Sequence, residues 1–578
     1  MSYAETLDRI PPHLKKYVVQ QDYDAYDQID QSVWRFVLLQ TYNQLKATAH
    51  PSYVDGLAKT GISVDRIPRI EEMNDCLGAF GWGAVAVSGF IPPRAFQEFQ
   101  SLGILTIAAD MRKANHLAYT PAPDIIHEAA GHAPIIPDPV YRKFLQRFGE
   151  VSRYAFSSRE DLAVYEAIRR LSIVKEELTS TPAEIRAVED QLWHAIDNIS
   201  FTSEAAYLSR LHWWTVEYGL IGKPEDYKIY GAGILSSVGE SFMLHLPEVK
   251  KLRLRARCIE TDYDITEQQP QLFVVEDFEA LNEILDRVVH DFAFKVGGNL
   301  ALLRAVSSGE VATVLLNTGL QVTGLVEEVV GGDSAYLRFT GPSALSYRDR
   351  HLPGHCRKRH PDGFGMPLGR MDGGTALSGL TEWGLDRIGY KGPGSKIEIR
   401  YQSGVYVEGR LQKFVTNDDG FLMLLTLSEC RVVLGDRLLF DPDWGEYDLA
   451  IGEEVMSAYA GAADPSYWPE SEFSEERFPK EKVYTPRDLQ LLELYKTTLN
   501  RDESDQEQML AKFGKVTHTL FETYPDHWLL GWNILERLTQ MDRGIQLACK
   551  IKDFMLAIEQ RRPRDIPVSM GLNYLGLI

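Results

Sequence analysis

Cysteine is scarce in this sequence. Only five cysteines occur in 578 residues, and they lie far apart: Cys76, Cys258, Cys356, Cys430 and Cys549. Their odd number and wide spacing do not suit the disulfide framework that stabilises many small secreted domains. We therefore expect reduced thiols and a cytoplasmic location.

The sequence also lacks an excess of positive charge and any long apolar run. Lys and Arg number 61 against 82 Asp and Glu, which gives a formal net charge of −21. A surface that binds nucleic acid needs clustered cations, so no such partner is expected. No apolar run approaches the roughly 20 residues that cross a bilayer, and the N-terminus lacks the apolar centre of a signal peptide. The sequence leaves a homo-oligomer open.

The chain is too long for a single compact core, and its texture changes along its length. Residues 1–300 carry apolar residues at helical spacing, as in SVWRFVLLQTYNQLK at 32–46. Residues 305–458 contain short Val-, Leu- and Tyr-rich runs between Gly and Asp, which predict antiparallel β modules. Residues 459–484 are rich in Pro, Ser and Glu and predict a linker, and residues 485–578 predict helices again. We therefore expect a multidomain protein with a mainly α domain, a small β domain and a helical C-terminal region.

The β region contains an apparent internal repeat. TGLQVTGLVEEVVGGDSAYLRF at 318–339 aligns with SGVYVEGRLQKFVTNDDGFLML at 403–424 without a gap, at a constant offset of 85 residues. Hairpins can resemble one another because turns favour Gly and Asp, but the ungapped register favours a duplication. The repeats would span about 311–345 and 396–430. The identical pairs are Gly319/Gly404, Val322/Val407, Gly324/Gly409, Val330/Val415, Asp333/Asp418 and Leu337/Leu422.

The segment YTPAPDIIHEAAGH at 119–132 carries two histidines beside a carboxylate. Asp124 is a good N-cap and Gly131 is a typical C-terminal stop, so a short helix is expected between them. His127 lies in that helix, and His132 follows its end. On an unbroken α-helix a step of five residues turns the side chain by about 140°. A break at Gly131 is therefore expected to bring the two imidazoles together at a metal ion.

A third candidate ligand is Glu217, in AAYLSRLHWWTVEYG at 205–219. It lies among aromatic residues, where a buried carboxylate is costly unless it is paired or bound to a cation. The alternatives are an ion pair with Arg210 or exposure to solvent. Two histidines and one carboxylate leave coordination positions open, which is typical of non-haem Fe(II) enzymes that bind O₂ rather than of structural zinc.

Two other metal hypotheses remain open. HEAAGH could be a zinc hydrolase site with Glu128 as general base, although zinc-protease helices space their histidines by four residues and not five. A second cluster lies in HLPGHCRKRH, beside three basic residues that would repel a cation. Its four potential ligands are His351, His355, Cys356 and His360.

Five segments of the N-terminal half occur together in a characteristic order. They are FGWGAVAVSGFIPPRAFQEF (80–99), YTPAPDIIHEAAGH, WWTVEYG, YGAGILSSVGE (230–240) and YDITEQQPQLFVVEDF (263–278). Over about residues 25–295 the sequence resembles the pterin-dependent aromatic amino acid hydroxylases, most of all the long bacterial phenylalanine 4-monooxygenases. The resemblance implies Fe(II) and a tetrahydropterin as cofactors, with O₂ and an aromatic amino acid as substrates. It favours hydroxylation of L-phenylalanine to L-tyrosine, and leaves tryptophan or tyrosine hydroxylation as alternatives.

The resemblance also implies roles for individual residues. It places the iron on His127, His132 and Glu217, with Glu128 as a catalytic residue beside the pterin. The pterin-binding set that it implies is Gly89, Phe90, Ile91, Phe96 and Glu128. Arg112 is implied to pair with the substrate carboxylate, for which a planar guanidinium is well suited. The remaining implied substrate contacts are Thr120, Pro123, Trp213 and Ser236.

Three positions depart from the family's usual pattern. Thr106 stands where animal phenylalanine hydroxylases carry a histidine near the pterin. His212 occupies a position usually filled by tyrosine beside the iron, and Tyr218 replaces the commoner phenylalanine after the ligand Glu. These departures leave the iron chemistry intact and leave the choice among Phe, Tyr and Trp open.

Overall fold

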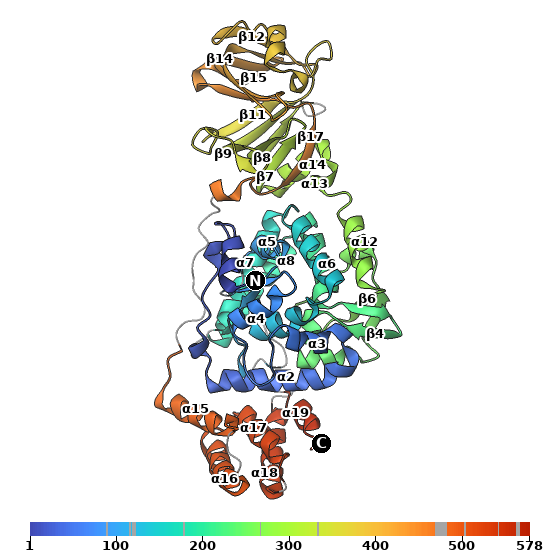
Figure 1. The fold of residues 1–578 in the computed structure, drawn as a ribbon, viewed down its shortest axis with the longest axis vertical. Coiled ribbons are helices and arrows are strands. Elements are labelled where there is room, and N and C mark those ends of the chain that lie inside the picture. Colours follow the sequence, from blue (N-terminus) through green and yellow to red (C-terminus); the bar gives the residue numbers. More distant parts are fainter. Residues whose placement is uncertain are drawn as a thin grey trace.

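The computed structural model shows three regions arranged along one long axis (Figure 1). Helices of the N-terminal half lie in the middle, the β region lies at one end, and the C-terminal helices lie at the other. The structure describes the chain apart from residues 88, 90, 115–116, 118–122, 177–179, 266–267, 332–334, 469–481, 502–504, 542 and 562–566. Within the described residues, no helix combines the length and the apolar character needed to span a membrane.

The N-terminal half is mainly helical, as predicted. Its helices are α1 (Tyr3–Arg9), α2 (Gln28–Thr48), α3 (Pro51–Lys59), α4 (Ile70–Gly78), α5 (Pro93–Ser101), α6 (Pro139–Ser152), α7 (Arg159–Glu176), α8 (Pro182–Asp197), α9 (Glu204–His212), α10 (Ala232–Leu235), α11 (Val238–Met243), α12 (Phe278–Val288), α13 (Ala293–Val296) and α14 (Gly298–Ser308). Strands β1 (Gly83–Val87) and β2 (Ile104–Ala108) pair in parallel. A second small sheet has the order β4-β3-β6-β5 and consists of β3 (Leu220–Lys223), β4 (Asp226–Ile229), β5 (Lys250–Arg253) and β6 (Gln271–Val275).

The long helix α2 shows how local sequence and packing agree. It begins at a capping box, in which the Asp27 side chain accepts hydrogen bonds from the backbone of Ile29 and Asp30. Its middle residues, such as Trp34 and Phe36, are fully buried. A helix that is apolar on most of its surface has to be covered on several sides, and here two different regions of the chain cover it.

The C-terminal helices cover the outer face of α2 (Figure 1). They are α15 (Pro486–Leu499), α16 (Gln506–Thr523), α17 (Trp528–Leu538), α18 (Ile545–Arg561) and α19 (Val568–Tyr574). The ring of Phe36 packs edge-on against Trp528 and Trp532, with centroids 5.1 and 4.8 Å apart, and Arg35 Nη2 lies 3.0 Å from Glu536 Oε1. One apolar core therefore joins the N-terminal half to the C-terminal helices. The predicted boundaries near residues 300 and 485 separate regions of different composition, and whether residues 1–300 fold alone stays a prediction.

The β region consists of two antiparallel sheets. The first has the order β10-β9-β8-β7-β17, with β11 on β9, and contains β7 (Val311–Leu316), β8 (Leu320–Val330), β9 (Tyr336–Tyr347), β10 (Arg350–His351), β11 (Gly363–Pro367) and β17 (Val455–Ala460). The second has the order β12-β13-β14-β15, with β16 on β14, and contains β12 (Ser395–Arg400), β13 (Val405–Thr416), β14 (Leu422–Leu434), β15 (Arg437–Phe440) and β16 (Tyr447–Ala450). Because β17 returns to β7, the chain enters and leaves the β region at the same edge.

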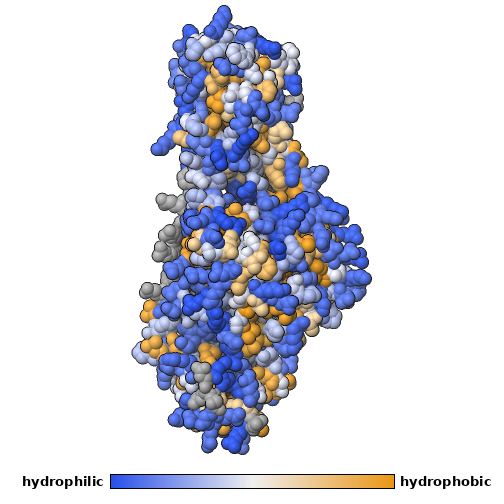
Figure 2. Space-filling view, in the orientation of Figure 1, coloured by the Kyte–Doolittle hydropathy of each residue, from blue (hydrophilic) through white to orange (hydrophobic). Residues whose placement is uncertain are grey.

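Polar and charged side chains cover most of the face shown in Figure 2, with apolar groups scattered among them. Acidic residues also lie where the start of α2 contacts the segment before α15. Lys482, which precedes α15, places Nζ 2.9 Å from Asp27 Oδ2 and also contacts Asp30 at the start of α2. Burial and the neighbouring Asp27 raise the pKa of Asp30 to about 6, although Lys482 opposes this effect.

Replacing Lys482 by methionine is expected to make stability more dependent on pH. Asp30 has a raised pKa, so the folded state binds its proton more tightly, and the free energy of unfolding falls as pH rises through that pKa. Without the Lys482 cation this pKa rises further. Because Lys482 is partly exposed, we expect Lys482→Met to lose about 1 kcal/mol near pH 8 and to approach the wild type near pH 5, measured by urea denaturation. Lys496→Met, which removes an exposed partner of Glu493, is the control. An equal loss for Lys482→Met at both pH values would contradict this account.

Candidate metal centre and adjoining cavity

Both segments that carry the predicted metal ligands are π-helical. One, η4, spans Ile126–His132, and the other, η6, spans Trp213–Glu217. Hydrogen bonds of a π-helix join residues five apart, so such residues lie on the same face. His127 and His132 therefore converge within one continuous helical segment. The predicted helix stop at Gly131 is wrong, because η4 continues through it into a short 3₁₀ turn, Ala133–Ile135.

Glycine is needed at position 131 for close packing. A Cβ atom there would lie 2.7 Å from the carbonyl oxygen of Ala232, the first residue of α10. A Cβ atom at Gly231 would lie 2.4 Å from the Gly219 nitrogen and 2.5 Å from the Glu217 carbonyl oxygen. The backbone at the start of α10 therefore touches both π-helical segments and fixes their separation.

Three side chains converge between these segments. His127 Nε2 lies 3.1 Å from His132 Nε2, and the two Glu217 carboxylate oxygens lie 3.3 Å from His127 Nε2 and from His132 Nε2. Adjacent ligand atoms about 2.1 Å from one ion are separated by about 3.0–3.4 Å, so the three side chains fit a divalent cation. The alternative partner for Glu217, Arg210, pairs with Asp262 instead.

Hydrogen bonds orient His127 for this role. The Ser236 hydroxyl donates to the carbonyl oxygen of Ala232 at 2.7 Å, and its oxygen lies 3.1 Å from His127 Nδ1. Because the hydroxyl proton is used on Ala232, the Ser236 oxygen accepts a hydrogen bond from His127 Nδ1. The lone pair of His127 is therefore on Nε2, the nitrogen that faces His132 and Glu217. A second hydrogen bond of this kind is a general feature of metal-bound histidine.

The charged groups around the cluster differ in their protonation. Burial alone would raise the pKa of Glu217, but His132 and His127 hold that pKa well below its usual range. Burial raises the pKa of Glu128 to about 8 against the opposing effect of His132. The Glu128 atom Oε2 lies 4.0 Å from His132 Nε2 and has no hydrogen-bond partner among the described residues. The geometry therefore gives Glu217 the charge and leaves Glu128 as the neutral neighbour.

Arg112 is buried and tied to Asp124. Its Nε and Nη2 atoms each donate to the Asp124 carboxylate at 2.8 Å, and Nη1 lies 3.4 Å from the Ser236 carbonyl oxygen. Asp124 also accepts a hydrogen bond from the His127 backbone, as expected for an N-cap. Burial would raise the pKa of Asp124, but Arg112 holds it below its usual value. The pair therefore connects a cavity-lining cation to the start of the ligand-bearing segment.

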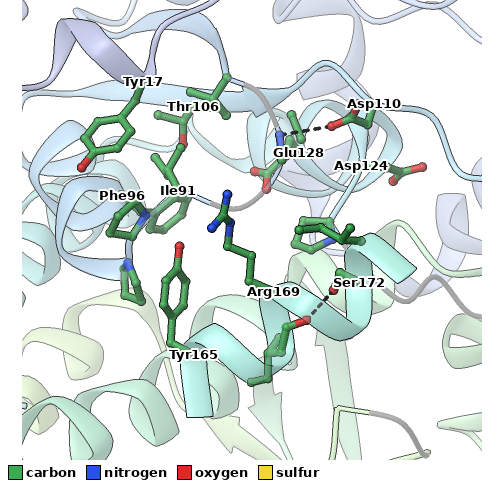
Figure 3. Close-up of a pocket in the computed structure, with 18 of the residues that line it drawn as sticks. Tyr17, Ile91, Phe96, Thr106, Asp110, Asp124, Glu128, Tyr165, Arg169 and Ser172 are labelled. Carbon is green, nitrogen blue, oxygen red and sulfur yellow. Dashed lines mark hydrogen bonds between the residues drawn. The ribbon is translucent and has the colours of Figure 1, made fainter. Parts of the chain in front are cut away.

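A cavity adjoins the cluster, and residues from distant parts of the chain line it (Figure 3). Ile91 and Phe96 border it, and Tyr165 and Arg169 of α7 point into it toward Phe96 and Glu128. Gly89 also borders it, and its backbone N–H donates to Asp110 Oδ2 at 3.2 Å. Two other predicted residues, Phe90 and Thr120, lie outside the described residues.

The remaining predicted site residues lie in different surroundings. Pro123 borders the cavity. Trp213 is stacked between Tyr218 and Tyr263, with ring centroids 4.7 and 4.3 Å apart, so both of its faces are covered. Tyr263 borders the cavity and was missed by the sequence analysis.

Two of the three unusual positions, Thr106 and His212, also border the cavity. His212 packs edge-on against Phe96 and places Nδ1 3.7 Å from the Glu217 carboxylate. Burial lowers the pKa of His212 to about 4. The imidazole is therefore neutral at physiological pH and lies close to the metal cluster.

Comparison with known proteins agrees with this geometry. A family model described as biopterin-dependent aromatic amino acid hydroxylase matches residues 16–201 and 199–297. Residues 16–297, called the hydroxylase domain below, match this family over just under half of the chain. The hydroxylase domain thus contains all the converging residues described above, and the match does not extend to residues 298–578.

Individual relatives of the hydroxylase domain include bacterial enzymes. Phenylalanine-4-hydroxylase of Chromobacterium violaceum is 27% identical over 308 residues, which cover 52% of this chain and 88% of that protein. Phenylalanine-4-hydroxylase of Pseudomonas aeruginosa is 26% identical over 292 residues, which cover 49% of this chain and 94% of that protein. Among solved structures, phenylalanine hydroxylase of C. violaceum with iron(III) and oxidised 7,8-dihydrobiopterin is 25% identical, covers 50% of this chain and 90% of that chain, and has a TM-score of 0.38.

Two features of the hydroxylase domain were not predicted from the sequence. Tyr165 and Arg169 of α7 carry no motif, and only their spacing of four residues shows that they share a helix face. The π-helices were also missed. The signal for them was present in the five-residue spacing of His127 and His132, which suits a π-helix better than a broken α-helix.

Gly131→Ala is expected to disturb the metal centre without removing a ligand. The new Cβ would press on the Ala232 backbone, which cannot move easily because it also contacts η6. We expect a loss of about 1–3 kcal/mol in the free energy of unfolding together with weaker iron binding, measured by denaturation and equilibrium dialysis. Gly514→Ala is the control, because no described atom lies within 4 Å of its Cβ position, and it should gain up to about 1 kcal/mol in its helix. Unchanged iron affinity in Gly131→Ala would show that α10 does not set the ligand geometry.

Proposed function

We propose that this protein is an Fe(II)- and tetrahydropterin-dependent monooxygenase that uses O₂ to hydroxylate L-phenylalanine to L-tyrosine. The observation that carries the proposal is the convergence of His127, His132 and Glu217 inside a domain of the biopterin-dependent hydroxylase family. Two imidazoles and one carboxylate with neighbouring open space are the donor set of non-haem Fe(II) enzymes. The names of the relatives favour phenylalanine over tyrosine and tryptophan.

Each ligand residue has a distinct task in this proposal. His127 and His132 offer neutral nitrogen donors, and Glu217 supplies the negative charge that holds the cation. Ser236, which remains a proposed substrate contact, also keeps His127 in the tautomer with its lone pair toward the metal. Bound iron and tetrahydropterin supply the electrons that activate O₂. The protein supplies position, charge and exclusion of water.

Some of the residues that line the cavity are proposed to contact the pterin, and others the amino acid substrate. Phe96 is placed to stack on the pterin ring, with Gly89 and Ile91 along its edge, and Tyr165 and Arg169 border the same space. Glu128, which the raised pKa keeps neutral, can hold a proton or donate a hydrogen bond next to the cofactor.

The substrate side is built around Arg112. Its outer edge is proposed to bind the amino acid carboxylate, while Asp124 holds the guanidinium in place. Thr120 and Pro123 remain proposed substrate contacts. Trp213, which is covered by Tyr218 and Tyr263, would act by supporting Tyr263 at the cavity wall.

The zinc-hydrolase alternative is not supported by the comparisons. It assigns Glu128 as the base of a zinc-protease helix, but such helices space their histidines by four residues, and His127 and His132 are five apart. The family match also points to pterin chemistry rather than hydrolysis.

Substituting Glu217 and Glu128 in turn distinguishes the iron-hydroxylase proposal from the zinc-hydrolase alternative. Glu217→Gln keeps the volume and removes the charge, so iron affinity should fall by more than about 100-fold, because loss of indirect partners alone costs 10–100-fold. Glu128→Gln, the matched control, should keep iron near the wild-type level and form less tyrosine per pterin oxidised. Equilibrium dialysis and product analysis give both readouts. Full iron retention in Glu217→Gln would disprove the ligand assignment.

We further propose that the two sheets of the β region arose by duplication. At the offset of 85 residues, β7, β8, β9 and β11 fall on β12, β13, β14 and β16, and the bounds differ by one or two residues. In both sets the last strand pairs with the third, as β11 does with β9 and β16 with β14. The pair Asp333/Asp418 of the sequence repeat is not compared, because Asp333 lies outside the described residues.

A further inference from the structure

A second cluster of metal-binding side chains lies between the two sheets of the β region. His355 and His360 belong to the connection between β10 and β11 of the first sheet, and Asp448 lies on β16 of the second. Asp448 Oδ2 is 3.5 Å from His355 Nδ1 and 3.7 Å from His360 Nε2. All three ligand atoms lie within 4.8 Å of one another. Ligand atoms of a tetrahedral zinc site lie about 3.3 Å apart. The two distances from Asp448 exceed this value by a few tenths of an ångström, and the longest distance in the cluster exceeds it by at most about 1.5 Å.

The two histidine nitrogen atoms that face Asp448 are buried, and their distances from its carboxylate are longer than a normal hydrogen bond. His355 is 3% exposed and His360 9% exposed. In the part of the chain that the structure describes, His355 Nδ1 and His360 Nε2 find no hydrogen-bond partner. These separations are close to those between two ligands of one cation, so the three side chains suit a common metal ion.

The surrounding residues support the carboxylate. Thr426 Oγ1 donates to Asp448 Oδ1 at 2.6 Å, and Arg359 donates to Asp448 Oδ2 at 2.9 Å and to Glu446 at 2.7 Å. Hydrogen bonds of this kind orient metal-bound carboxylates. Of the basic residues that argued against a cation, Arg359 is shared between Glu446 and the Asp448 oxygen that faces the histidines, and Arg357 lies over the ring of Trp468.

The fold itself does not require these side chains. At the offset of 85 residues His355 corresponds to Phe440, His360 to Gly445, and Asp448 to Gly363. The corresponding positions in the other copy of the repeat therefore carry no metal ligand, although the strands around them are arranged alike. The three side chains therefore occur once in the β region, with the histidines beside the first sheet and the aspartate on the second.

We propose that His355, His360 and Asp448 bind a zinc ion that links the two β sheets, separately from the iron of the hydroxylase domain. The ligand set differs from the one predicted from the sequence. His351 stacks on Tyr467 with centroids 4.8 Å apart, and neither it nor Cys356 belongs to the cluster. Zinc is the ion most often held in a closed four-ligand shell of this kind. A water molecule can complete the four-coordinate shell.

The first test is zinc binding to the full-length, metal-free chain. We expect His355→Gln and His360→Gln each to bind one equivalent of Zn²⁺ less than the wild type in equilibrium dialysis. His351→Gln, on the neighbouring strand β10, is the control and should bind as much as the wild type. Far-UV circular dichroism checks that each variant is folded. Equal zinc in the wild type and in both cluster variants would overturn the proposal.

The second test measures thermal stability in a variant that lacks two of the proposed iron ligands. In the His132→Gln/Glu217→Gln background, added Zn²⁺ should raise the melting temperature, because ligand binding stabilises the folded state. Adding His360→Gln to that background should abolish the shift, and adding His351→Gln should not. A shift that survives His360→Gln would place the zinc elsewhere and contradict the assignment.

Discussion

Glu217 brings a negative charge into a nearly closed space between two helical segments that are distant in the sequence. Burying a lone carboxylate is unfavourable by several kcal/mol, and here two imidazoles and a metal ion would offset that cost. The arrangement requires His127 and His132 on one helix face, which the π-helix η4 provides, and Glu217 at the end of the second π-helix, η6. The start of α10 keeps η4 and η6 at the right separation through contacts that only glycine permits.

The residues that would bind the metal and those proposed to bind the substrate share hydrogen-bond partners. Asp124 caps the segment that carries His127 and also holds Arg112 with two hydrogen bonds. Ser236 touches both groups, because its hydroxyl orients His127 and its carbonyl oxygen faces Arg112. A change on either side is therefore transmitted to the other through short, buried hydrogen bonds.

Much of this arrangement could be predicted from the sequence, since the motifs are dense and the ligand types are restrictive. The mainly helical N-terminal half and the antiparallel β region followed from the spacing of apolar residues. Two kinds of feature could not be predicted. The π-helices depend on packing against α10, and Gly131 therefore resembled a helix stop. The burial of α2 by the C-terminal helices depends on contacts such as Phe36 with Trp532, which no local pattern encodes.

The central claim is that this chain hydroxylates an aromatic amino acid with iron, a tetrahydropterin and O₂. The most direct measurement supplies the full-length protein with Fe(II), tetrahydrobiopterin, ¹⁸O₂ and phenylalanine, tyrosine or tryptophan in turn, and reads the products by mass. The account predicts tyrosine that contains one ¹⁸O atom from phenylalanine, and no product when pterin or Fe(II) is omitted. Failure to incorporate ¹⁸O into any of the three amino acids, or turnover that is unchanged without pterin, would contradict it.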